Sequence, residues 1–398
     1  MDSTFIILFS IASLVAIVAR SARIPYTIAL VVVGLGVGSI GILHAPHLTK
    51  ELLFEVFLPG LIFEAAYNLN AHELRANWRT VASLAVPGVV AAIALTALLA
   101  VGAFHLLGME GALSWRDLLV FAALVAATDP IAVVSMFRQV GVSPRLTTLV
   151  EAESLFNDGT SIVVLSLVLA YVTGTAGGAT FFVLKFAGVV GGGVLVGSTI
   201  AFLLAHVSKQ LDDPMVEITL TVIAAYGSFI AAERLNLSGV IATVCAGLVL
   251  GTYGRAVAMA EQTRISVDAF WEYVAFAMNS IVFLLIGLEV RGSGLLHSAV
   301  PILVAFCAVV FARFGVVVAV TLLMQRTSER IPFAWAGLIT WGGLRGALSM
   351  VLALALPADF PNRETLVNMT FGVVLLSLLL QGLTMPRVAA RLSVASVS

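Results

Sequence analysis

The sequence predicts an all-α polytopic membrane protein with about thirteen transmembrane helices. Of its 398 residues, 60% are hydrophobic and 11% are charged, whereas soluble domains carry about 25% charged residues. So much apolar surface could not all be buried away from water, so the chain requires lipid as its solvent. A helix that crosses the hydrocarbon core needs roughly 20 apolar residues, and runs of this kind recur along almost the whole chain.

The apolar runs divide the chain 1–398 into candidate spans of a single membrane unit. They lie near 4–19, 26–43, 51–69, 80–106, 117–137, 146–172, 180–206, 215–233, 237–253, 268–289, 298–324, 333–356 and 366–385. No basic segment precedes the first run, which follows Met1 and Asp2 almost at once. We therefore expect a first membrane helix there rather than a cleaved signal peptide.

The basic residues between the spans predict an orientation. With an outside N-terminus, the inside segments hold Arg20, Arg23, Arg75, Arg79, Arg138, Arg145, Lys209, Arg255, Arg264, Arg326, Arg330, Arg387 and Arg391. The outside segments hold Lys50, Arg116, Arg234, Arg291 and Arg363. Because lysine and arginine concentrate in cytoplasmic loops, we expect an outside N-terminus and a cytoplasmic C-terminus. The short tail after Arg387 predicts no soluble regulatory domain in this chain.

Several other functions are disfavoured. The net charge of −1 gives no electrostatic reason to expect a nucleic-acid partner. The stretch 36–41 matches a dinucleotide pattern, but it lies inside an apolar span, where its glycines indicate close helix packing. His72–Ala76 lacks the second histidine of a zinc protease motif, and Cys245 and Cys307 have no metal-ligand spacing. We expect no cofactor.

The informative residues are the ionisable ones inside spans, since each costs a few kcal/mol in the bilayer. Among them are Glu64, Asp129, Glu153, Asp158, Arg313 and Arg345. In the sixth span, residues four apart share a helix face. Ser154 therefore aligns with Asp158, and Glu153 aligns with Asn157. A hydroxyl beside a carboxylate is a plausible partial shell for a small hard cation; a polar patch that merely joins helices is the alternative.

Two spans are predicted to be interrupted. Pro130 must kink or open the fifth span, which frees carbonyl groups beside Asp129. Such groups are tolerated at membrane depth only where they line a cavity or meet a partner. In the twelfth span, glycines flank Arg345 within the segment 342–346. Interrupted helices in the two halves of a chain indicate a binding site near the middle of the membrane.

Three motifs in this order suggest a family. Thr128-Asp129-Pro130, the run Glu153–Gly159 and the run Gly343–Ala347, together with the number of spans, resemble the cation:proton antiporter superfamily. The branch that the chain resembles is the prokaryotic NhaP-type sodium/proton antiporters, relatives of the animal sodium/proton exchangers.

The resemblance implies a fold and a mode of transport. It implies two inverted repeats with two crossed broken helices, in a core domain at about 51–172 and 298–386. A dimerisation domain would comprise about 1–45 and 180–290, and the core would move against it as an elevator. The implied setting is a homodimer surrounded by lipid in the plasma membrane of a prokaryote.

The resemblance also implies residue roles in exchange of Na⁺ or Li⁺ for H⁺. Asp158 would bind the cation and the proton in turn, with Asp129, Ser154 and the Thr128 carbonyl as further cation ligands. Asn157 would orient the region where the broken helices cross.

The remaining roles concern charge. The Asn157-Asp158 pair resembles the electroneutral branch, in which an arginine pairs with the glutamate of the sixth helix. Arg313 fits that position opposite Glu153, and Arg345 is the competing candidate. Glu64 would lie near the cytoplasmic cation path. The alternatives are potassium/proton exchange on the same fold, a cation channel and an intramembrane enzyme; the chain shows no paired residues typical of an intramembrane protease.

Overall fold

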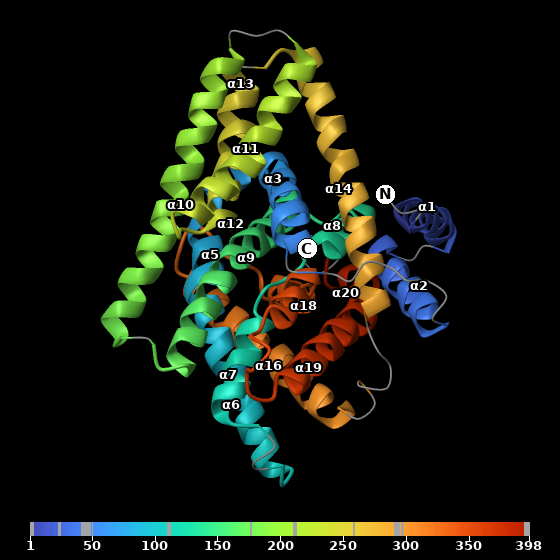
Figure 1. Ribbon diagram of the computed structural model, residues 1–398, viewed down its shortest axis with the longest axis vertical. Coiled ribbons are helices and arrows are strands. Elements are labelled where there is room, and N and C mark those ends of the chain that lie inside the picture. The colour runs from blue at the N-terminus through green and yellow to red at the C-terminus, as the bar shows by residue number, and fades with distance from the viewer. Residues whose placement is uncertain are drawn as a thin grey trace. The chain divides into compact units, whose positions relative to one another are not determined.

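All the regular secondary structure is helical in the part of the chain that its computed structural model describes. That part comprises residues 4–22, 25–40, 49, 51–109, 113–175, 177–209, 213–257, 259–289, 295 and 298–393. Figure 1 shows helices and connecting segments there, and none of these residues forms a β-strand. The all-α class predicted from the sequence is therefore confirmed for the described residues.

Helix bounds follow the apolar runs. The first half of the chain contains α1 (Thr4–Ala22), α2 (Tyr26–Ile40), η1 (Leu52–Phe57), α3 (Leu58–Asn68), α4 (Ala71–Ala76), α5 (Trp78–Ser83), η2 (Leu84–Gly88), α6 (Val89–Leu106), α7 (Trp115–Leu124), α8 (Ile131–Val140) and α9 (Pro144–Val172). The rest contains α10 (Ala179–Ser208), α11 (Pro214–Arg234), α12 (Gly239–Val249), η3 (Leu250–Gly254), α13 (Arg255–Val257), α14 (Glu261–Glu289), α16 (Ala299–Met324), α17 (Phe333–Trp341), α18 (Ala347–Leu354), α19 (Arg363–Leu376), η4 (Ser377–Gly382) and α20 (Leu383–Ser393). The η elements are π-helical turns.

Within the described residues, eight helices are long and apolar enough to cross a membrane. Two shorter apolar helices, Ile6–Ser21 and Tyr26–Ile40, precede them. The count of thirteen spans and the orientation stay predictions. Arg23, Lys50 and Arg291, which contribute to the predicted orientation, lie outside the described residues.

Both predicted interruptions are present. The fifth predicted span consists of α7 and α8, which are separated by the non-helical residues 125–130. The twelfth consists of α17 and α18, separated by residues 342–346. Proline and clustered glycine therefore act as the sequence predicts, because neither continues a helix well.

The chain forms two compact units. The first comprises Met1–Lys50, Ala76–Asn157 and Ser280–Ser398, and the second comprises Glu51–Arg75 and Asp158–Asn279. In the first unit, α16 packs against α6, α17 and α19, while α20 packs against α8 and α17. Both interrupted helices belong to this first unit.

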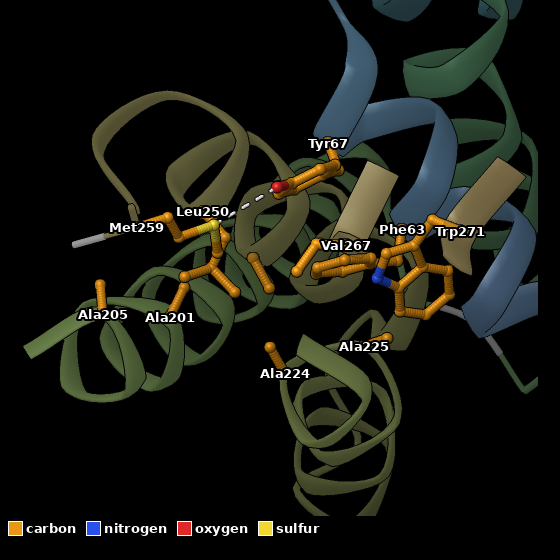
Figure 2. Close-up of a cluster of buried hydrophobic side chains, with 11 residues drawn as sticks. Phe63, Tyr67, Ala201, Ala205, Ala224, Ala225, Leu250, Met259, Val267 and Trp271 are labelled. Carbon is orange, nitrogen blue, oxygen red and sulfur yellow. Dashed lines mark hydrogen bonds between the residues drawn. The ribbon is translucent and has the colours of Figure 1, made fainter. Parts of the chain in front are cut away.

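The second unit has an aromatic core centred on Trp271 of α14, which is fully buried (Figure 2). The ring of Phe63 on α3 lies 4.7 Å from that of Trp271, centroid to centroid. The indole Nε1 of Trp271 donates a hydrogen bond to Thr221 Oγ1 at 2.9 Å. Small alanines of α10, α11 and α12 surround the rings, and this arrangement lets helix backbones approach closely.

Close approach is most evident where α10 meets α12 in the second unit. A Cβ atom at Gly193 would lie 2.7 Å from the Ser238 carbonyl oxygen. One turn later, a Cβ at Gly197 would overlap the carbonyl oxygen of Ala242. Gly188, nearer the start of α10, has open space around it. The helix pair therefore requires glycine at positions 193 and 197 but not at 188.

We predict that Gly197→Ala destabilises the protein and that Gly188→Ala does not. Alanine at 197 forces α10 away from α12, and overpacking of this kind costs about 1–3 kcal/mol. At the open position, alanine is preferred over glycine in a helix by about 0.5–1 kcal/mol. Melting temperatures of the purified variants in detergent test this; equal shifts for both variants would contradict the contact.

Candidate functional site

The first interruption exposes backbone groups between α7 and α8. α7 ends at Leu124, and Pro130 precedes the first residue of α8. Asp129 Oδ1 accepts a hydrogen bond from the Ile131 N–H at 3.0 Å, so this carboxylate satisfies the first N–H group of α8. The carbonyl groups of Ala126 and Thr128 have no helical donor in this segment. They accept hydrogen bonds from side chains elsewhere in the chain.

The second interruption depends on two glycines that make space for charged side chains. A Cβ atom at Gly343 would overlap the guanidinium group of Arg313. A Cβ at Gly346 would lie 2.6 Å from Asp129 Oδ2. Glycine at these positions therefore allows Arg313 and Asp129 to approach the backbone of the segment between α17 and α18.

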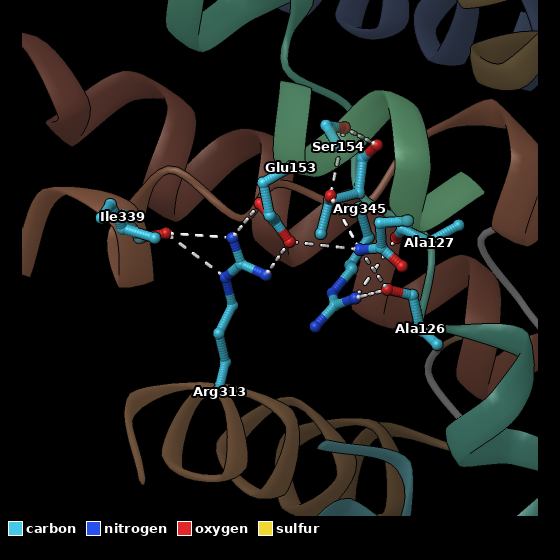
Figure 3. Close-up of polar contacts among 9 residues, drawn as sticks. Ala126, Ala127, Glu153, Ser154, Arg313, Ile339 and Arg345 are labelled. Carbon is cyan, nitrogen blue, oxygen red and sulfur yellow. Dashed lines mark hydrogen bonds and ion pairs between the residues drawn. The ribbon is translucent and has the colours of Figure 1, made fainter. Parts of the chain in front are cut away.

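The two interruptions contact each other. The Asp129 N–H donates a hydrogen bond to the Leu344 carbonyl oxygen at 2.8 Å. Arg345 Nη1 donates to the carbonyl oxygens of Ala126 at 2.6 Å and Ala127 at 3.2 Å (Figure 3). These carbonyls follow the C-terminal end of α7, where the helix dipole is negative, so the buried cation of Arg345 compensates it.

Two polar residues of α9 complete this part of the site. Ser154 Oγ donates a hydrogen bond to the Thr128 carbonyl oxygen and accepts one from Thr128 Oγ1 at 3.1 Å. Asn157 Nδ2 donates to Thr128 Oγ1 at 3.1 Å and to the Ala126 carbonyl at 3.2 Å. Ser154 and Asn157 are each 1% exposed. The unwound backbone of the first interruption is thus bonded directly to α9.

A buried ion pair lies beside this network. Arg313 of α16 contacts Glu153 of α9 through Nη1–Oε1 at 3.2 Å and Nη2–Oε2 at 2.9 Å. The same guanidinium donates to the Ile339 carbonyl from Nη2 at 3.1 Å, near the end of α17 (Figure 3). The sequence left open whether Arg313 or Arg345 faces Glu153; Arg313 does, and Arg345 bonds to backbone carbonyls instead.

Seven of the predicted site residues therefore form one network in the first unit. They are Thr128, Asp129, Glu153, Ser154, Asn157, Arg313 and Arg345. Asp158 is half-buried and follows Asn157 on α9, one helical turn after Ser154, where the second unit begins. Glu64 lies on α3 in the second unit, where its Oε1 accepts a hydrogen bond from Asn68 Nδ2 at 2.8 Å.

Sequence reasoning missed two residues of the network, Ser377 and Gln381. Ser377 Oγ accepts a hydrogen bond from the Arg345 N–H at 3.0 Å and donates one to Gln381 Oε1 at 2.8 Å. Their signal was a serine and a glutamine four residues apart in an otherwise apolar run, a spacing that places both on one helix face.

Comparison with known proteins decides the family. A family model described as "Sodium/hydrogen exchanger, transmembrane" matches residues 7–391. The chain belongs to this family. The resemblance to NhaP-type antiporters is thereby confirmed, and the sodium/hydrogen exchanger model covers both interruptions and all the site residues named above.

Curated relatives of this exchanger are similar over nearly its whole length. It is 39% identical to the Na⁺/H⁺ antiporter ApNhaP of Aphanothece halophytica, over 98% of this chain and 74% of the relative. It is 36% identical to the Na⁺/H⁺ antiporter NhaH of Halobacillus aidingensis, over 98% of this chain and 97% of the relative. The solved structure of the sodium proton antiporter MjNhaP1 from Methanocaldococcus jannaschii at pH 8 matches with a TM-score of 0.76 and 22% identity, covering 98% and 97% of the two chains. That likeness shows the fold.

We predict that Glu153→Gln destabilises the exchanger far more than Glu151→Gln. Removing one partner of a buried pair leaves an uncompensated charge, which costs about 3–5 kcal/mol. Glu151 pairs with Arg138 at 3.0 Å, but the arginine side chain is 70% exposed, and an exposed pair contributes about 0.2–1 kcal/mol. Thermal unfolding in detergent measures both variants; a similar small shift for the two would show that the Glu153–Arg313 pair is not a stabilising contact.

Proposed function

We propose that this chain exchanges Na⁺, or Li⁺, for H⁺ across the membrane. The observation that carries the proposal is the contact between the Ser154 hydroxyl of α9 and the Thr128 carbonyl in the interruption between α7 and α8. Small hard cations prefer oxygen ligands of this kind, and the adjacent Asp129 supplies a carboxylate. Relatives named Na⁺/H⁺ antiporters support sodium as the cation.

Asp158 is the proposed exchange group. Helical register places it on the same face of α9 as Ser154, one turn away. A proton and a sodium ion compete for the Asp158 carboxylate. Either ligand neutralises the carboxylate, and only the neutralised site crosses the apolar barrier, because a bare charge in hydrocarbon is costly. Glu64 is proposed to lie on the approach path of the cation.

Exchange of one cation for one proton follows if Asp158 is the one carboxylate that changes its ligand in each cycle, while Asp129 keeps its hydrogen bond to the Ile131 N–H. Asn157 occupies the position before Asp158 and cannot carry charge. Glu153 is paired with Arg313 at 2.9 Å, and breaking this pair on one side to bind a cation would leave a buried charge. We therefore propose that the pair is structural and that Asp158 carries the exchange alone.

The proposed transport cycle uses the domain division that the family resemblance implies. The core at about 51–172 and 298–386, built from two inverted repeats within thirteen spans, moves as an elevator against 1–45 and 180–290. The proposed assembly is a homodimer in the plasma membrane of a prokaryote, with an outside N-terminus. The excess of lysine and arginine in the segments assigned to the cytoplasmic side supports this orientation.

Asp158→Asn is expected to abolish exchange and to leave the protein folded. The amide cannot release a proton, so neither ion can be exchanged. Purified protein is reconstituted into vesicles with an acid interior and a trapped pH-sensitive dye, and Na⁺, Li⁺ or K⁺ is added outside. Wild type and Glu151→Gln should alkalinise the interior with Na⁺ or Li⁺, whereas Asp158→Asn should not.

Three other outcomes change the conclusion. Exchange by Asp158→Asn would exclude the proposed carboxylate. A response to K⁺ alone would keep antiport and change the cation. Conductive currents without coupled proton movement would indicate a channel.

The initial rate of exchange is expected to be independent of membrane potential. One cation exchanged for one proton moves no net charge, so a potential performs no work on the cycle. Thiocyanate gradients set an inside-negative potential without adding a competing cation. A several-fold slower sodium uptake at inside-negative potential would instead require more than one proton per sodium ion, because net positive charge would then have to leave the negative interior.

A further inference from the structure

The π-helical turn η4 carries two buried polar side chains at membrane depth. Ser377 is 1% exposed and Gln381 is 3% exposed, and both lie between apolar residues of the helix α19–η4–α20. A π-helical turn inside an α-helix is uncommon and frequently occurs at functional sites. The mechanism proposed above uses neither side chain.

The direction of the hydrogen bonds at Ser377 follows from its partners. The Arg345 N–H can only donate, so Ser377 Oγ accepts this bond at 3.0 Å. The Ser377 hydroxyl hydrogen is then directed to Gln381 Oε1 at 2.8 Å. Gln381 thereby orients the hydroxyl so that its lone pairs face Arg345.

The Arg345 N–H and the Leu344 carbonyl belong to one peptide group, which is planar. Ser377 bonds to the N–H side of this group, and the Asp129 N–H bonds to the carbonyl side at 2.8 Å. The peptide is therefore fixed from both sides, with η4 on one side and the interruption between α7 and α8 on the other. A continuous series of hydrogen bonds leads from Gln381 to the backbone of Asp129.

A second contact ties the same segment to the first interruption. Arg345 Nη1 donates to the Ala126 carbonyl at 2.6 Å (Figure 3). Without a fixed backbone at Arg345, both this side chain and the Leu344 carbonyl would be free to turn away. The Thr128 carbonyl and the Asp129 carboxylate would then lose a support that sets their separation.

We propose that Ser377 and Gln381 are positioning residues for the cation site. They orient the Leu344–Arg345 peptide, and through it they set the spacing of the oxygen atoms of Thr128 and Asp129. This inference rests on the proposed function. The spacing of a shell of oxygens decides which ion radius fits, so the pair also sets the preference between Na⁺ and Li⁺.

The test measures apparent KM and maximal rate for Na⁺ and Li⁺ in proteoliposomes, for Ser377→Ala and Gln381→Met. Ser377→Ala removes the acceptor of the Arg345 N–H, and a lost hydrogen bond corresponds to about a threefold to tenfold rise in KM. Gln381→Met leaves the serine in place, so the rise should be smaller. Maximal rates should stay within about twofold, and the ratio of the two KM values should change.

Thr370→Val is the matched control. Thr370 is also buried, on α19, but its Oγ1 bonds back to the Leu366 carbonyl of the same helix at 2.8 Å. Losing this hydroxyl should leave both KM values at the wild-type level. A merely structural role of Ser377 would lower the melting temperature without moving KM or the ratio between the ions.

The outcomes separate this inference from the proposed function. If wild type exchanges and Asp158→Asn does not, unchanged KM values in Ser377→Ala and Gln381→Met overturn the positioning role alone. A loss of maximal rate at constant KM overturns it as well. If wild type shows no exchange, the proposed function fails and the positioning role fails with it. If Ser377→Ala does not fold, Gln381→Met decides by the same two measurements.

Discussion

The site depends on one constraint, that backbone polar groups at membrane depth must have hydrogen-bond partners. Residues 125–130 and 342–346 leave the helical pattern, so their N–H and carbonyl groups need partners elsewhere. The two segments supply one such partner to each other, because the Asp129 N–H donates a hydrogen bond to the Leu344 carbonyl. Three buried side chains make further hydrogen bonds to this backbone. Asn157 of α9 and Arg345 donate to the Ala126 carbonyl, and Ser377 of η4 accepts from the Arg345 N–H.

The two interruptions arise from different chemistry, and the difference has a structural reason. In the first, Pro130 has no N–H to offer the Ala126 carbonyl, which accepts from Asn157 and Arg345 instead. In the second, Gly343 and Gly346 remove side chains altogether, so that Arg313 and Asp129 can occupy the space. The first segment therefore presents oxygen atoms, and the second leaves space for the side chains of Arg313 and Asp129.

Much of this arrangement could be predicted from single residues. The proline and the glycines located both interruptions, and the cost of buried charge singled out Asp129, Glu153 and Arg345 within apolar spans. The choice between Arg313 and Arg345 as the partner of Glu153 could not be made, because it depends on where two long side chains point. The Ile339 carbonyl that binds Arg313 carries no side-chain signal at all. Ser377 was missed because one serine in an apolar helix ordinarily bonds to its own backbone.

Formal charge in the network explains why the proposed exchange group is a residue outside it. Glu153 and Asp129 contribute two negative charges, and Arg313 and Arg345 contribute two positive ones. The network in the first unit is thus balanced before any ion binds. Asp158 adds one further carboxylate on α9, and in the proposed function its charge is the one that a cation or a proton neutralises. On that proposal, the ion bound at Asp158, rather than a charged side chain of the network, determines whether the site can cross the membrane.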